Sequence, residues 1–175
     1  VHAAAKRLAG RTVFQPSPPD REAFQTRGGI VELADSLNAQ VDRFGADGIS
    51  IGYHNHHFEF LAPEIDGGSA YTFFISQLDP RVVIELDTYW AIVGGADPID
   101  LFDSYGDRIT HIHAKDGPIS SAPGHANVAL GTGAVDVPRI LRASPDRTWV
   151  LEFDAAAIDP IDESAQSIDY LRSQQ

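Results

Sequence analysis

Five short segments of the chain are rich in Val, Ile and aromatic residues, and longer segments with helical periodicity separate them. Such side chains are enriched in β-strands because they pack well on a pleated surface. Several of the segments are almost continuously apolar, as expected when both faces of a sheet are covered. The pattern predicts strands over residues 11–15, 48–55, 82–87, 109–114 and 148–153.

The segments between these strands carry apolar residues at helical spacing. Leu33, Leu37, Val41 and Phe44 follow one another at intervals of four, four and three residues, which predicts one helix that stops at Gly45. Further helices are predicted to open at Asp97-Pro98 and at Asp136-Val137-Pro138, to lie within residues 67–78, and to close the chain over residues 164–171, where Ile168 and Leu171 pack.

Strands that alternate with helices predict an α/β fold of parallel βαβ units. We expect residues 1–175 to form a single domain, either an open doubly wound sheet or a barrel. No glycine-rich phosphate loop follows the first strand, which weakens the nucleotide-binding sheet. Residues 131–133 (Gly-Thr-Gly) precede a helix without directly following a strand, so they are a weak phosphate-loop signal.

Composition narrows the classes of partner and cofactor. The formal net charge is −12 and no cluster of Lys and Arg is present, which argues against nucleic-acid binding. No apolar run approaches the roughly 20 residues of a membrane span, and no secretory signal is visible, so we expect a cytoplasmic protein. The chain has no cysteine, so His and carboxylate side chains must hold any metal.

Polar side chains gather at the ends of four predicted strands. His54, Asp87, His113 and Glu152 follow one another at steps of 33, 26 and 39 residues, each about one βα unit. The carboxyl ends of parallel barrel strands converge on one face, where active sites form. On the second strand His54 and His56 share a face with Ser50 and Gly52, small residues that suit a ligand site; on the fourth, His111, His113 and Lys115 share a face.

Each of these residues also has a structural alternative. A lone buried His is commonly a hydrogen-bonded core residue, Asp87 could cap the turn at Thr88, and Glu152 could be a salt-bridge partner. Together, two carboxylates and one or two imidazoles suit Mn²⁺, Mg²⁺, Co²⁺ or Zn²⁺. Such a metal polarises a substrate carbonyl or hydroxyl, and a nearby base moves the adjacent proton.

The sequence resembles the xylose isomerase-like family of sugar phosphate isomerases and epimerases, in its inosose dehydratase-like branch. Matching segments follow one another in family order from about Arg11 to Leu171, at residues 52–60, 86–90, 94–98, 108–116, 131–136 and 149–154. The resemblance implies a TIM barrel with a divalent metal held by Glu, Asp, His and Glu from four consecutive strands.

The resemblance assigns the last three metal ligands to Asp87, His113 and Glu152. His54 stands where many relatives have the first Glu, with His56 or Glu59 as alternative ligands. It further implies catalytic roles for His56, Glu59, Lys115 and Glu152, with Lys115 or His56 as the base. Asn55, Tyr89 and Trp90 are expected to contact substrate, Trp90 replacing a substrate-binding His of ketose epimerases.

The family barrel has eight strands, and the predicted five correspond to its later ones, which implies a partial (β/α)8 barrel. We expect a fragment, an oligomer or a second chain that completes the barrel, because an incomplete barrel exposes sheet edges. The expected function is a metal-dependent isomerase, epimerase or dehydratase-type lyase, acting next to a carbonyl of a sugar, polyol or keto-sugar. The alternative is a non-catalytic carbohydrate-binding module or an inactive barrel fragment; a DNA endonuclease is disfavoured by the acidity.

Overall fold

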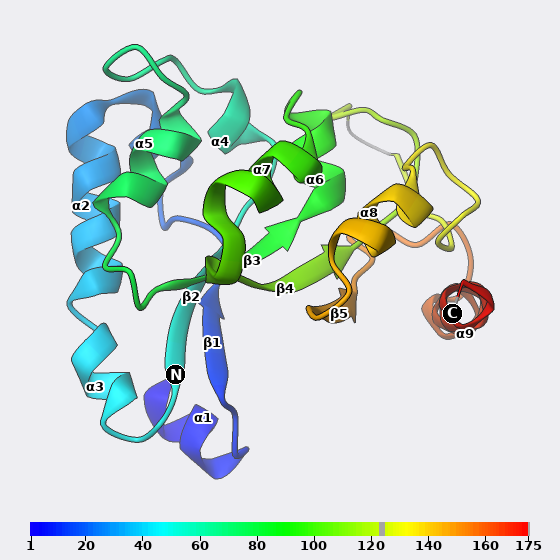
Figure 1. Cartoon of the computed structure of the whole chain (residues 1–175), viewed down its shortest axis with the longest axis horizontal. Coiled ribbons are helices and arrows are strands. Elements are labelled where there is room, and N and C mark those ends of the chain that lie inside the picture. Colours follow the sequence, from blue (N-terminus) through cyan, green and yellow to red (C-terminus); the bar gives the residue numbers. More distant parts are fainter. Residues whose placement is uncertain (123–124, 175) are drawn as a thin grey trace. The chain divides into compact units, whose positions relative to one another are not determined.

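The computed structural model describes residues 1–122 and 125–174, and within these residues five strands form one sheet in chain order (Figure 1). The strands are β1 (Thr12–Gln15), β2 (Ser50–His54), β3 (Val83–Asp87), β4 (Ile109–Ala114) and β5 (Thr148–Leu151). Residue pairs join β1 to β2, β2 to β3 and β4 to β5, each in parallel. All five predicted strands are therefore confirmed, with ends shortened by at most two residues.

The chain divides into two compact units, Val1–Glu85 and Leu86–Gln175, with the division inside β3. The first unit contains α1 (His2–Arg7), the 3-10 helix η1 (Arg21–Gln25), α2 (Arg27–Asn38), α3 (Val41–Gly45), α4 (Phe58–Leu61) and α5 (Ala70–Gln77). The second contains α6 (Thr88–Val93), α7 (Pro98–Tyr105), the 3-10 helix η2 (Gly106–Arg108), α8 (Val137–Ala143) and α9 (Pro160–Ser173). Whether residues 1–175 form a single domain stays a prediction.

The helix predicted to run continuously to Gly45 is two helices, α2 and α3. Its apolar residues are all buried as expected, but the N–H of Gln40 donates to the carbonyl of Leu37, a tighter turn than an α-helix makes. The side chain of Asn38 also joins the end of α2 to the end of α5. Its amide donates to the carbonyl of Gln77 at 2.9 Å and accepts from the N–H of Asp79 at 2.7 Å.

Aromatic side chains fill the core of the first unit, where α2 and α5 lie side by side (Figure 1). Phe24, Tyr53 and Phe74 are fully buried, and the ring of Phe74 lies 5.3 Å from that of Phe24 and 4.7 Å from that of Tyr53. A side chain added at Gly52 would meet the ring of Phe14 and the carbonyl of Val83. Gly52 therefore makes room for a neighbouring ring, whereas the sequence interpretation reserved that space for a ligand.

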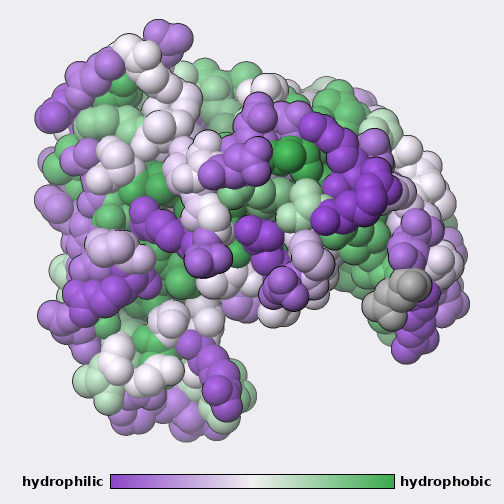
Figure 2. All heavy atoms as spheres, viewed as in Figure 1, coloured by the Kyte–Doolittle hydropathy of each residue, from purple (hydrophilic) through white to green (hydrophobic). Residues whose placement is uncertain are grey.

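An aspartate followed closely by a proline begins three of the helices described in the second unit, as predicted for two of them. Asp97, Asp136 and Asp159 cap α7, α8 and α9, and each helix has a proline in its first turn. Hydrophilic residues are prominent over α7 and α8 in Figure 2, and an exposed ion pair joins Arg139 to Asp97 at 2.7 Å. The signals for these helices are local, which explains why the sequence predicts their starts well.

Helix α9 faces the rest of its unit with polar side chains, contrary to expectation. Ile168, which was predicted to pack, is 40% exposed. Ser167 and Glu163 are buried instead, because the Ser167 hydroxyl accepts from the N–H of Leu130 and the Glu163 carboxylate accepts from the N–H of Ala157. None of the helices in the described residues has the length and apolar composition that crossing a bilayer requires.

The loop between β4 and α8 is organised by the buried carboxylate of Asp116. Its two oxygens accept four backbone hydrogen bonds of 2.8–3.0 Å, from the N–H groups of Gly117, Gly131, Gly133 and Val135. The Gly-Thr-Gly segment therefore directs two of its N–H groups at a side-chain carboxylate of the chain itself. This arrangement removes the weak phosphate-loop interpretation.

Candidate metal centre

Asp87 ends β3 and is fully buried. Its Oδ1 accepts a hydrogen bond from the N–H of Trp90 at 2.8 Å, which caps α6. Its Oδ2 lies 2.9 Å from the ammonium nitrogen of Lys115. The capping alternative from the sequence is thus confirmed, and it uses one oxygen while the other points into a charged cluster.

His113 and Glu152 meet at the carboxyl ends of β4 and β5. His113 pairs with Val150 in the parallel register, so Glu152 follows two residues further along and projects from the same face. Glu152 Oε2 lies 3.0 Å from His113 Nδ1, and one ligand atom each of Asp87, His113 and Glu152 lies within 4.8 Å of the others. The hydrogen bond from His113, and then those from Lys115, hold the pKa of Glu152 well below its usual range despite partial burial.

Lys115 is buried among three carboxylates. Its Nζ lies 2.9 Å from Asp87 Oδ2, 2.5 Å from Glu152 Oε2 and 2.9 Å from Asp154 Oδ2. Burial disfavours the charged ammonium, but the three carboxylates outweigh burial and raise the pKa of Lys115 above its usual value. Lys115 is therefore a permanent cation at neutral pH in this structure.

The donor set fits a divalent cation on charge as well as on chemistry. With the imidazole of His113 counted as neutral, three carboxylates and one ammonium leave two negative charges around the buried Asp87 and Lys115, with Glu152 and Asp154 partly exposed. Uncompensated charge in such a partly buried cluster is unfavourable, and two positive charges would neutralise it. Asp87, His113 and Glu152 could hold such an ion, and these oxygen and nitrogen donors suit Mn²⁺, Mg²⁺, Co²⁺ and Zn²⁺ alike.

His54 and Glu85 occupy neighbouring positions in the first unit. They are paired in the register of β2 and β3, with His54 Nδ1 3.3 Å from Glu85 Oε2, and both are buried. The ring of His56 lies 5.0 Å from that of His54. Asn55, between them, is fully buried. The ligand role of His54 and the functional roles of Asn55 and His56 stay predictions.

Glu59 is fully buried in the same segment. Its Oε1 accepts from the Tyr53 hydroxyl at 2.8 Å, and its Oε2 accepts from the N–H of His56 at 2.9 Å. Burial, and then the nearby Glu59 carboxylate, raises the pKa of the Tyr53 hydroxyl. Glu59 thus fixes the backbone at His56, and its predicted catalytic role stays a prediction.

The two aromatic residues of α6 differ in their surroundings. Tyr89 is 2% exposed, and its hydroxyl donates to the carbonyl of Pro118 at 2.8 Å. Trp90 is half-buried, and its Nε1–H donates to Asp154 Oδ2 at 3.1 Å. Substrate contact by Tyr89 and Trp90 stays a prediction, and only Trp90 combines partial exposure with a place in the charged cluster.

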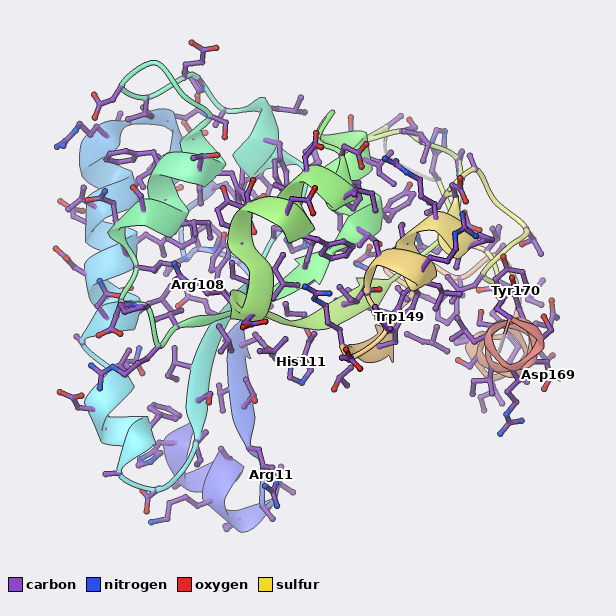
Figure 3. All side chains as sticks on the ribbon, in the orientation of Figure 1. Arg11, Arg108, His111, Trp149, Asp169 and Tyr170 are labelled. Atoms are coloured by element: carbon purple, nitrogen blue, oxygen red, sulfur yellow. The ribbon has the colours of Figure 1, made fainter. Side chains whose placement is uncertain are left out.

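From the sequence, Asp154 is expected either to support the ligands from behind or to lie in a loop, and the structure brings it to Lys115 and Trp90. Its position two residues after Glu152 was a usable signal, because alternate residues of an extended chain share a face. His111, labelled in Figure 3, lies two residues before His113 on β4, and its Nδ1 is 2.8 Å from Thr110 Oγ1. His113 is a member of the ligand cluster, whereas the contact of His111 is with its own neighbour Thr110.

The sequence profile of the xylose isomerase-like TIM barrel family matches residues 3–174, and the chain belongs to that family. Five parallel strands separated by helices agree with this fold, so the predicted fold class is confirmed. The chain is 33% identical over 110 residues to the inosose dehydratase of Lacticaseibacillus casei, a match that covers 62% of this chain and 34% of the relative. The predicted resemblance to the inosose dehydratase-like branch is confirmed by this similarity.

Solved structures share the fold. Two sugar phosphate isomerase/epimerases of Parabacteroides distasonis ATCC 8503 superpose with TM-scores of 0.81 and 0.78, at 22% and 25% sequence identity. Each match covers 98% of this chain, and 60% and 62% of the respective relatives. The chain thus spans about a third of the length of the curated relative and about 60% of these two structures.

Proposed function

We propose that this chain carries the metal centre of a divalent-metal-dependent lyase that removes water next to the carbonyl of a keto-polyol or keto-sugar. The observation that carries the proposal is the meeting of Asp87, His113 and Glu152, with ligand atoms within 4.8 Å of one another and two negative charges around them. Similarity to an inosose dehydratase supports a dehydratase over an isomerase or epimerase, and supports inosose as the first substrate to test.

His54 is the fourth ligand in this proposal. The family resemblance assigns it to the position of the first ligand, where many relatives have Glu. Glu59 is less suited to be a ligand, because both of its oxygens already accept hydrogen bonds from Tyr53 and His56. The proposed set contains two imidazoles and two carboxylates.

When bound, the metal would supply a Lewis acid that polarises the substrate carbonyl and lowers the energy of the enolate. Removing the proton next to that carbonyl requires a base, and breaking the β-carbon–oxygen bond requires a proton for the departing hydroxyl. The raised pKa keeps Lys115 protonated, so Lys115 is not suited to be the base and would instead stabilise the departing oxygen as a charged hydrogen-bond donor, with the proton itself delivered by the protonated base. We assign the base to His56, the other candidate from the sequence, and substrate contact to Asn55 and Trp90.

The proposal is tested by loading the metal-free chain with Mn²⁺ and measuring affinity by calorimetry, followed by an assay on inosose in deuterated water. We expect one bound ion, chelator-sensitive loss of water, and deuterium exchange at the carbon next to the carbonyl. Deuterium exchange without loss of water would instead favour an isomerase or epimerase.

Glu152→Gln and His113→Ala should each weaken metal binding strongly, because the first replaces a charged carboxylate donor by a neutral amide and the second removes an imidazole donor. His111→Ala is the matched control, since it removes an imidazole from the same strand without touching the donor set. Failure of the wild-type chain to bind metal would overturn the proposal. Metal binding without deuterium exchange or turnover on keto-polyols would overturn the lyase and favour the alternative, a binding module or an inactive barrel fragment.

A further inference from the structure

Asp154 is held in place from both its side chain and its backbone. Its Oδ2 accepts hydrogen bonds from Lys115 Nζ at 2.9 Å and from Trp90 Nε1 at 3.1 Å. Its own N–H donates to Asn127 Oδ1 at 2.8 Å. Asn127 is 4% exposed, and its Nδ2 donates to the carbonyl of Asp116, so the anchor reaches the organised loop after β4. These contacts fix the position of the partly exposed Asp154 carboxylate.

The contacts of Lys115 fall into two groups. Asp87 Oδ2 and Glu152 Oε2 belong to the candidate metal ligands. Asp154 and the ring of Trp90, whose centroid lies 5.8 Å from Nζ, do not. A carboxylate and an indole face together make a favourable site for an ammonium group.

A cation bound by Asp87 and Glu152 would meet the ammonium of Lys115 at the same oxygens. Two like charges that share ligands repel strongly in a partly buried site. Lys115 can stay in the cluster only if contacts outside the ligand set hold it. Asp154 and Trp90 are positioned to be those contacts.

We propose that Asp154 is a positioning residue that, with the ring of Trp90, holds the Lys115 ammonium beside the metal site and so frees Asp87 and Glu152 for the ion. The functional meaning of this arrangement rests on the proposed metal-dependent activity, whereas the Asp154–Lys115–Trp90 contacts do not. In this proposal Asp154 raises the affinity of the site for the metal indirectly, by holding Lys115.

The first test is made on the metal-free protein and exploits the small number of lysines and tryptophans in the chain. Lys6 and Lys115 are the two lysines, and Trp90 and Trp149 are the two tryptophans. In protein labelled with ¹⁵N-lysine and ¹⁵N-tryptophan, Asp154→Asn should move the indole resonance of Trp90 upfield and speed hydrogen exchange of the Lys115 ammonium. Signals of Trp149 and of the exposed Lys6 serve as internal references, and Trp149→Phe provides the assignment.

The second test is a double-mutant cycle on Mn²⁺ affinity. Lys115→Met should tighten binding by about tenfold, because it removes the competing cation. Asp154→Asn should weaken binding, and this effect should be at least about threefold larger with Lys115 present than in the Lys115→Met background. The cycle separates the action through Lys115 from the plain loss of one negative charge. Asp103→Asn removes an exposed carboxylate of the same unit and is the charge-matched control.

The outcomes separate this inference from the proposed function. Unchanged Trp90 and Lys115 signals in Asp154→Asn would overturn the inference, whatever the protein does with metals. Equal effects of Asp154→Asn in both backgrounds would overturn it while leaving the metal site intact. Shifted signals in a chain that binds no metal would contradict the metal-dependent function and the proposed effect on affinity, and would leave Asp154 as an anchor of Lys115 alone. Circular dichroism of each variant verifies that it is folded.

Discussion

Replacing Asp116 by Asn should destabilise the fold severely, although the change removes no bulk. The carboxylate is fully buried and accepts four backbone hydrogen bonds, two on each oxygen. An amide keeps one acceptor oxygen and turns an NH₂ group toward the other two N–H donors. Hydrogen bonds to charged groups contribute about 1.5–3 kcal/mol each, so losing two costs about 3–6 kcal/mol. That is a large fraction of the roughly 5–15 kcal/mol that stabilises a typical domain.

Urea denaturation followed by circular dichroism measures this cost. With a slope of about 2 kcal/mol/M, the midpoint of Asp116→Asn should fall by roughly 1.5–3 M. Asp103→Asn removes an exposed charge and should change stability by less than about 0.5 kcal/mol. An Asp116→Asn midpoint within about 0.5 M of wild type would refute the reasoning, since it would mean that the four donors find other partners.

Three further predictions concern other parts of the chain. The hydrogen bond from His113 lowers the pKa of Glu152, so ionised Glu152 stabilises the metal-free protein above its unfolded pKa of about 4.3, and this contribution is lost as the pH falls below that value. The stability of Glu152→Gln should therefore fall less steeply with acid than that of the wild type, and stability curves that run parallel would contradict this. Asn38→Ala removes the two hydrogen bonds from the Asn38 side chain to the backbone at the end of α5, and should lower the free energy of unfolding in urea by about 1–3 kcal/mol. An unchanged midpoint would show that water replaces these bonds. Gly52→Ala places a methyl group against the ring of Phe14 and should cost about 1–3 kcal/mol in thermal unfolding; a stabilised variant would mean that the ring moves freely.

Much of the fold could be predicted from the sequence because its signals are local. Strand composition located all five strands, and an aspartate followed within two residues by proline located the starts of α7 and α8. The break between α2 and α3 was not predictable, because Leu37 and Val41 keep a helical apolar face on both sides of it. At the break, the side chain of Asn38 donates a hydrogen bond to the carbonyl of Gln77, 39 residues away in the sequence. A contact at that separation leaves no trace in the local pattern of apolar residues.

The ligand candidates could be predicted for a different reason, namely the geometry of parallel strands. Residues at successive strand ends meet whatever the intervening helices contain, so Asp87, His113 and Glu152 followed from position alone. The sequence left open whether Asp154 supports the site or lies in a loop, since a carboxylate just beyond a strand is as typical of a loop as of a site. Its role depends on where Trp90 and Lys115 point, which only the packed structure determines.

Asp87 illustrates why structural and functional interpretations of one residue need not compete. One oxygen caps α6 through the N–H of Trp90, and the other faces Lys115 within the candidate ligand set. The cap fixes the carboxylate in one orientation, which is what a ligand needs, because a freely rotating side chain would lose entropy on binding an ion. The same hydrogen bond also sets the start of α6, and Trp90 in turn reaches Asp154. A substitution at Asp87 would therefore disturb helix, ligand set and Lys115 together, and for this reason Glu152 and His113 are the cleaner positions at which to test the metal centre.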